Sequence, residues 1–199
     1  MKVMLLVLIA MVACGSNTSI EQSWKPPGGA SAELRKVVTV MLWKNPGVRR
    51  SAEDELAARL QKAGVYAVPA YTVLSDQEVA DPALARARLQ AQGFDGAIVM
   101  RVIGREQQIH YVPPTYAGYW GGAYGWGYGG GYLQTETIVR LETAAYSLRD
   151  GKLVYSAMSK TTDPDSIPSL ISGVTSTVAK ALEKERVVIA QRAAAPSGG

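Results

Sequence analysis

The stretch from Val37 to Trp43 is nearly continuous in apolar and β-branched residues, and this run constrains the fold more than any other feature. Such a run is typical of a central strand that is buried on both faces of a sheet. The turn-forming residues 45–47 end the run, and a helical pattern follows until Gly64. We expect Ser51 to cap this helix, because Asp54 stands three residues later, at the capping-box spacing.

The alternation of strand and helix then continues. A second strand is expected over Val65–Tyr71 and a third over Ala97–Ile103, with a helix between them. Asp81 and Pro82 supply an N-cap and a proline at the first helical position, which together indicate where that helix begins.

Two longer strands are expected over Thr135–Leu148 and Lys152–Thr162. The pair Asp150-Gly151 between them predicts a two-residue type I′ turn, which is a strong hairpin signal. A turn of that length would place Tyr146 opposite Tyr155 across the pair.

The last element is the clearest helix in the chain. Apolar residues recur at i, i+3 and i+4 from Ile167 to Leu182, and Ser166 is the expected N-cap. The order is therefore β-α-β-α-β-insert-β-β-α, which predicts an α/β (α+β) fold with a single mixed sheet and helices packed on it. We expect one domain over residues 35–190 and a disordered tail over 191–199.

A leader sequence is expected before this domain. A basic residue precedes an unbroken apolar run, Val3–Ala13, whose eleven residues fall short of the roughly 20 that a spanning helix needs. The sequence Met11-Val12-Ala13-Cys14-Gly15 resembles the lipobox of bacterial lipoproteins, in which signal peptidase II cuts before a lipidated cysteine. This resemblance implies a lipoprotein signal peptide over 1–13. It also implies a flexible tether over 14–34 that begins with an acylated Cys14.

The lipobox implies where the mature protein resides. Palmitate and other acyl chains on Cys14 would anchor it stably in a membrane, whereas a secreted protein with a chance cysteine is the alternative. By resemblance to enterobacterial lipoproteins, Gly15 after the cysteine favours the outer membrane, with the domain facing the periplasm. Loss of Lys2 with the leader would lower the formal net charge from +4 to +3. No basic run accompanies this small charge, so nucleic acid is not an expected partner.

An aromatic insert over residues 111–133 separates the third strand from the fourth. It is rich in Tyr, Gly and Trp, and no charged residue lies between positions 111 and 132. Such a segment can pack on itself, contact a protein partner or another copy of the chain, or meet a glycan or a membrane interface. A 22-residue loop is uncommon in a compact domain and is often functional. The candidate binding residues are Tyr116, Tyr119, Trp120, Tyr124, Trp126, Tyr128 and Tyr132.

The sequence nominates no reaction centre. One cysteine and one histidine cannot build a zinc site of Cys and His ligands, and the usual hydrolase, metalloprotease and phosphate-binding motifs are missing. We therefore expect no enzyme activity, no cofactor and no metal site. An enzyme of unknown reaction, with His110 as its best candidate base, is the least favoured alternative.

Charged residues have structural explanations. The acids from Glu53 to Glu55 are expected to stabilise a helix N-terminus through the helix dipole. On the strands that flank the insert, Arg101 is expected to face Glu142, and Gln107 to face Glu136. This ladder could stabilise a solvent-exposed sheet face or offer a polar docking face for a partner.

Three stretches, 49–56, 64–69 and 93–97, support a resemblance that covers about residues 36–188. They resemble the amino-terminal domain of the Tol-Pal translocation protein, the lipoprotein activators of penicillin-binding proteins and the curli-secretion lipoprotein. The chain resembles more narrowly a proteobacterial envelope lipoprotein family with a Tyr/Gly-rich insert and no assigned activity. The resemblance implies a membrane-anchored, non-catalytic module that binds an envelope partner or self-associates. The alternative is a peptidoglycan-binding lipoprotein that uses the aromatic insert.

Overall fold

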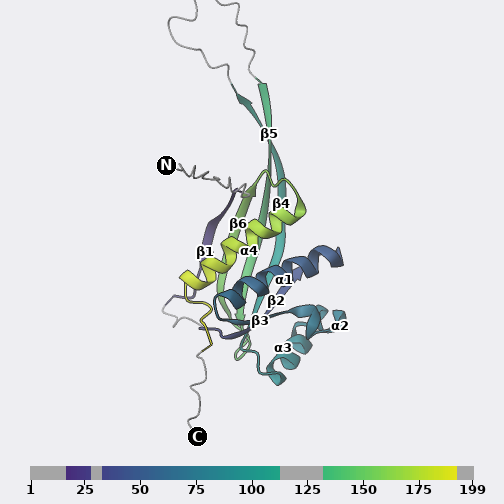
Figure 1. Cartoon of the computed structure of the whole chain (residues 1–199), viewed down its shortest axis with the longest axis vertical. Coiled ribbons are helices and arrows are strands. Elements are labelled where there is room, and N and C mark those ends of the chain that lie inside the picture. Colours follow the sequence, from purple (N-terminus) through teal and green to yellow (C-terminus); the bar gives the residue numbers. More distant parts are fainter. Residues whose placement is uncertain (1–16, 28–32, 113–131, 192–199) are drawn as a thin grey trace, which may run out of the picture.

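The computed structural model describes residues 17–27, 33–112 and 132–191. Its centre is one six-stranded sheet with the strand order β1-β6-β5-β4-β2-β3 (Figure 1). The strands are β1 (Asn17–Trp24), β2 (Lys36–Leu42), β3 (Tyr66–Pro69), β4 (Gly96–Val112), β5 (Tyr132–Ser147) and β6 (Leu153–Thr162). The helices are α1 (Pro46–Lys62), α2 (Asp76–Ala80), α3 (Pro82–Ala91) and α4 (Ile167–Lys184), with a 3-10 turn over Ala70–Thr72.

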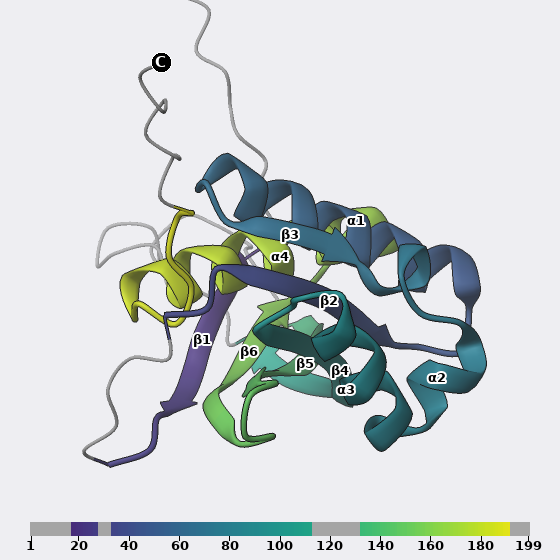
Figure 2. The same cartoon turned by 90° about the horizontal axis from the view of Figure 1, so that it is seen from below.

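The sheet is mixed, and helices pack on it, which confirms the predicted fold class. Strand β2 runs parallel to β3 and β4, whereas the β4–β5, β5–β6 and β6–β1 pairs are antiparallel. Helices α1 and α4 cover one face, and α2 and α3 lie over part of the other (Figure 2). We call these the helix face and the open face. The larger core lies on the helix face and contains Leu56, Leu60 and Ile98, all fully buried.

Local capping explains where the helices begin. Asp81 caps α3 and Ser166 caps α4, as the sequence predicts. The predicted cap of α1 is wrong, because Asn45 accepts hydrogen bonds from the backbone N–H groups of Gly47 and Val48 at 2.9 and 3.2 Å. The following proline starts the helix there, and Ser51 lies inside it.

The predicted tether is wrong over residues 17–24, which form the edge strand β1. This strand pairs with β6, and the hydroxyl oxygens of Thr18 and Thr161 lie 2.9 Å apart. Half-buried Ile20 packs against the main core. An edge strand is solvated on one side and can be polar, so its composition resembles that of a linker.

Two bulges overturn details of the predicted register. Between Ala145 and Tyr146 the register shifts, so Tyr146 faces Leu153 instead of Tyr155. The connecting loop is longer than the predicted two-residue turn, because Ser147 N–H bonds to the carbonyl of Lys152 at 2.9 Å.

A second bulge lies between Val102 and Gly104. Arg101, which precedes the bulge, faces Glu142 as predicted. Beyond the bulge the register is displaced by one residue, so Gln108 faces Glu136, and the predicted pair with Gln107 is wrong. A bulge adds one residue to one strand, and a count along the sequence cannot see it.

Candidate functional site

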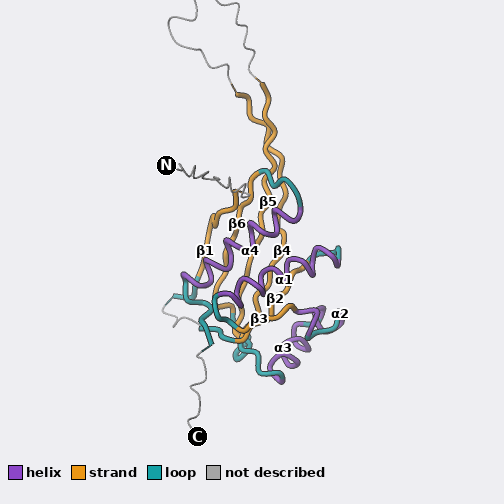
Figure 3. The backbone as a smooth tube through the Cα atoms, viewed as in Figure 1, coloured by secondary structure: helices purple, strands orange, loops and turns teal. Residues whose placement is uncertain are grey.

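Strands β4 and β5 run past the rest of the sheet and form a two-stranded projection (Figures 1 and 3). On one side, β2 pairs with β4 only as far as Arg101, and on the other, β6 pairs with β5 only as far as Ile138. We call residues 107–112 and 132–137 the β-arm. Their ladder continues to the pair Val112 and Tyr132.

The β-arm presents two exposed apolar side chains. Ile109 is 68% exposed and Leu133 is 69% exposed, more than any other large apolar residue described. An isolated two-stranded ribbon is at best marginally stable in water, and it gains stability when one of its faces is packed. The β-arm therefore has the properties of a contact surface.

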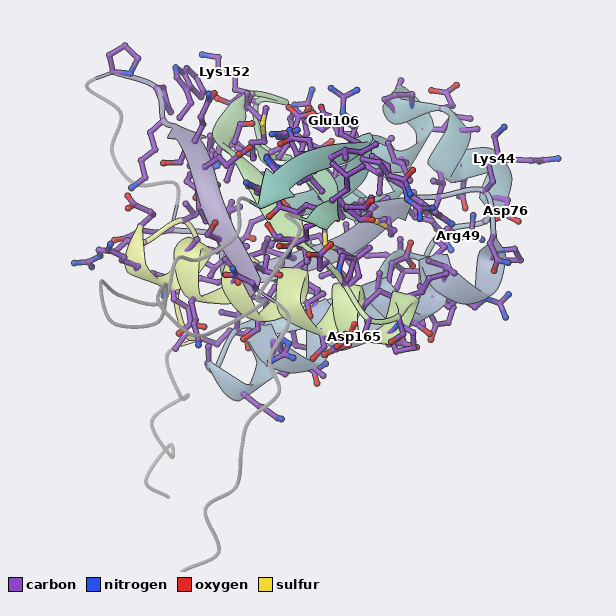
Figure 4. The ribbon with its side chains drawn as sticks, turned by 90° about the horizontal axis from the view of Figure 1, so that it is seen from above. Lys44, Arg49, Asp76, Glu106, Lys152 and Asp165 are labelled. Carbon is purple, nitrogen blue, oxygen red and sulfur yellow. The ribbon has the colours of Figure 1, made fainter. Side chains whose placement is uncertain are left out.

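A charged cluster braces the base of the β-arm on the open face. The Arg140 guanidinium donates to Glu21 in β1 at 2.9 Å and to Glu106 in β4 at 2.8 Å. Hydrogen bonds from Arg140 to these two carboxylates raise the pKa of the guanidinium. Figure 4 is viewed from the end of the domain that bears the β-arm. In this view Glu106 and Asp165 lie on opposite sides of the sheet.

The remaining ion pairs on β4 and β5 also have a structural explanation. The Arg101 guanidinium contacts the Glu142 carboxylate, to which Ser156 also donates a hydrogen bond at 3.4 Å. His110 Nε2 lies 3.5 Å from Glu136, and the imidazole is more than half exposed. Exposed pairs of this kind contribute about 0–1 kcal/mol each, and they link the two neighbouring strands.

No metal site is evident in the described part of the chain, where no group of three or more His, Cys, Asp or Glu residues is suitably placed. His110 contacts a carboxylate on the neighbouring strand, and no described nucleophile is bonded to it. Across residues 17–27, 33–112 and 132–191, no helix is long and apolar enough to cross a membrane.

An apolar groove of about 530 Å³ opens on the helix face at the base of the β-arm. It lies between the first turns of α1 and α4, and the sheet forms its floor. Ile167 and Trp43 line it and are themselves exposed, by 51% and 38%. Its other apolar lining residues are Met41, Val48, Ala52, Met100, Val102, Val139, Leu141, Pro164, Leu170, Ile171 and Val174.

Glu53 is a buried carboxylate, and its predicted role at a helix N-terminus is wrong. It lies inside α1 with only 1% of its surface exposed, not in the first turn where the helix dipole acts. Its two carboxylate oxygens accept from the backbone N–H groups of Met41, at 3.0 Å, and Tyr71, at 3.4 Å. Desolvation by burial raises the pKa of Glu53 above its ordinary value, against the lowering effect of these two hydrogen bonds. The carboxylate joins the end of β2 to the 3-10 turn.

The sequence-predicted binding residues fall mostly outside this description. Cys14 lies outside the described residues, and so do Tyr116, Tyr119, Trp120, Tyr124, Trp126 and Tyr128. Tyr132 is the first residue of β5 and stands opposite Val112. The aromatic insert therefore joins the two strands of the β-arm at its far end.

Comparison with known proteins identifies no family. A scan against protein-family models finds no match, and a search of curated proteins finds none either. The expected relation to the Tol-Pal translocation protein therefore stays a prediction.

Solved structures with a similar chain path include two bacterial proteins. PelC from Paraburkholderia phytofirmans, solved as a dodecamer, is 15% identical and has a TM-score of 0.48, with 88% of this chain and 99% of that chain covered. The lipoprotein GNA1162 from Neisseria meningitidis is 16% identical and has a TM-score of 0.42, with 75% and 99% covered. At these scores the two similarities carry no argument about function, which has to come from the residues and geometry of this chain.

Proposed function

We propose that this chain is a lipoprotein of the bacterial envelope, anchored in the outer membrane through acyl groups on Cys14 and facing the periplasm. Its domain binds a protein partner and catalyses no reaction. The observation that carries the proposal is the position of β1, which begins only three residues after Cys14 and is hydrogen-bonded into the sheet. A lipobox-like cysteine directly before a folded strand fits an anchor that holds the domain close to a membrane.

The anchor is tested with the variant Cys14→Ser. Without the thiol no diacylglyceryl group can be attached, so we expect the protein to leave the membrane fraction and to incorporate no labelled palmitate. The variant Ser16→Ala keeps the cysteine and serves as the matched control. Persistence of Cys14→Ser in membranes after washing with high salt and carbonate would contradict the proposed anchor.

Partner binding is assigned to the apolar groove at the base of the β-arm. Monomeric proteins rarely leave such surfaces uncovered, and an apolar hollow with a few polar groups at its edge is the usual form of a binding site. Ile167 and Trp43 can contact an apolar side chain of a partner, and Arg105, Asp163 and Asp165 stand among the polar lining residues.

The groove is tested by photo-crosslinking in living cells. With p-benzoylphenylalanine at position 167, we expect one discrete adduct with an envelope protein, which mass spectrometry would identify. The adduct should weaken at least fivefold when Trp43→Ala is added. The control position is 84, since Leu84 is a similarly exposed apolar residue (56%) outside the groove. Equal crosslinking from positions 167 and 84 would remove the groove as the binding site.

A further inference from the structure

We infer that the β-arm contacts the lipid bilayer beside the anchor, so that the domain meets the membrane at a second point. The inference rests on the proposed acylation of Cys14. It concerns only the described residues of the β-arm, 107–112 and 132–137. The partner surface is the interfacial layer of a phospholipid membrane.

One row of paired residues relates the anchor to the β-arm. Asn17 stands opposite Thr162, Thr162 opposite Ile138, and Ile138 opposite Glu106. Because β1 runs antiparallel to β6, it begins, at Asn17, at the end of the sheet from which the β-arm projects (Figure 1). The anchor and the β-arm therefore lie at the same end of the domain.

The segment from Cys14 to Asn17 can span only about half the length of the β-arm. Three residue steps separate Cys14 from Asn17, and a fully extended chain covers about 10 Å in that number of steps. The β-arm continues for six residue pairs beyond the row of Asn17, which is about 20 Å at the rise of a β-strand. The end of the β-arm therefore reaches about 10 Å past the most distant position available to Cys14. Acyl chains on Cys14 would be in the bilayer, so an upright β-arm must enter the same layer.

The side chains of the β-arm suit the membrane interface. Ile109 lies three pairs beyond the row of Asn17 and Leu133 five, and both are more than two-thirds exposed. The β-arm contains only two acidic or basic residues, His110 and Glu136, which lie 3.5 Å apart. The β-arm has no lysine or arginine, so apolar contact, and not attraction to anionic headgroups, would hold it at the membrane.

Photo-crosslinking to lipid tests this geometry. The full mature chain, lipidated in cells, is reconstituted into vesicles of phosphatidylethanolamine and phosphatidylglycerol. It carries p-benzoylphenylalanine at position 133, 109, 107 or 152. Lys152 follows the β5–β6 turn at the opposite end of the domain and is the control for a site away from the membrane.

We expect a graded yield of lipid adducts. Position 133 should give at least tenfold more lipid adduct than position 152. Position 109 should be intermediate and position 107, one pair beyond the row of Asn17, lower still. Equal yields at positions 133 and 152 would overturn the inference. Adducts from position 133 to a second copy of the chain in place of lipid would also overturn it, in favour of self-association.

A second sample separates this inference from the proposed anchor. In it the only cysteine, Cys14, is coupled through a maleimide to phosphatidylethanolamine in the vesicles, so attachment does not depend on cellular lipidation. If mass spectrometry finds no acyl groups on Cys14 from cells, the proposed anchor fails, and the coupled sample still measures the reach of the β-arm. If Cys14 is acylated but position 133 gives no lipid adduct in either sample, only the β-arm inference fails.

Discussion

Replacement of Glu53 by alanine is expected to lower the free energy of unfolding by about 2–4 kcal/mol. The substitution removes the acceptor of two backbone N–H groups, those of Met41 and Tyr71, at a site that is 1% exposed. Each buried donor left without a partner costs about 1–3 kcal/mol. The substitution also removes a buried carboxyl group whose burial is itself costly, and this gain offsets part of the loss. Urea denaturation followed by circular dichroism measures the loss. The control is Asp54→Ala, since Asp54 on the same helix accepts only an exposed hydrogen bond from the Tyr71 hydroxyl.

The variant Glu53→Gln tests the electrostatic part of this account. Burial raises the pKa of Glu53 in the folded state, so the folded protein holds this proton more tightly than the unfolded chain. Its contribution to stability is therefore fully present below the unfolded-state pKa and is lost as the pH rises through the folded-state pKa. Glutamine does not titrate, so the stability of wild type minus that of Glu53→Gln should fall as the pH rises from 4 to 7. A difference that stays constant would show that Glu53 has an ordinary pKa.

Tyr155→Ala is expected to destabilise the protein by about 3–5 kcal/mol, the range for truncation of a large aromatic in a core. Tyr155 is 1% exposed and lies in the main core, and its hydroxyl interacts with the Ser23 side chain of β1. The substitution leaves a cavity beneath the sheet and removes a link between the core and the edge strand. The midpoint of thermal unfolding should fall by roughly 6–20 °C for a domain of this size.

Tyr146→Ala provides the matched control for Tyr155→Ala. Tyr146 follows Ala145, whose side chain lies in the main core, so Tyr146 points to the open face, where it is 37% exposed. We expect it to cost less than about 1 kcal/mol. Equal losses for the two variants would indicate that both tyrosines lie in the same core, as the two-residue turn predicts.

The fold was largely predictable because its central strands and helices are buried, and burial leaves a pattern of apolar residues in the sequence. The strand over residues 36–42 is apolar at every position except Lys36 and Thr39, and α4 has a regular apolar stripe with a capping serine. The edge strand β1 carries only one apolar residue toward the core, so nothing in its composition separates it from a linker. The five-residue helix α2 is too short for a periodic pattern. Both bulges depend on backbone geometry that side-chain periodicity does not report.

The candidate site was predictable only in outline. The aromatic insert marks the position of the β-arm, but the predicted strands stop at Ile103 and resume at Thr135, short of the observed ends at Val112 and Tyr132. Residues 107–110 lie beyond the rest of the sheet, and no residue from 104 to 110 is buried, so this part of β4 lacks the alternation that reveals a strand. The groove forms where two helices and the sheet diverge, and only the tertiary structure brings its residues together. The burial of Glu53 could not be predicted, because nothing in the sequence distinguishes a buried acid on a helix from a solvated one.

Under the proposed anchor on Cys14, the docking of β1 on β6 has a consequence for proteolysis of the chain. A protease that cuts the chain between β1 and β2 breaks the covalent path from the anchor to the domain, yet the pairing of Asn17–Trp24 with β6 is untouched. The nicked domain would then be released only when an eight-residue strand dissociates from the sheet. With the proposed anchor on Cys14, retention of the nicked domain would thus depend on the pairing of β1 with β6 and on the inferred contact of the β-arm with the bilayer.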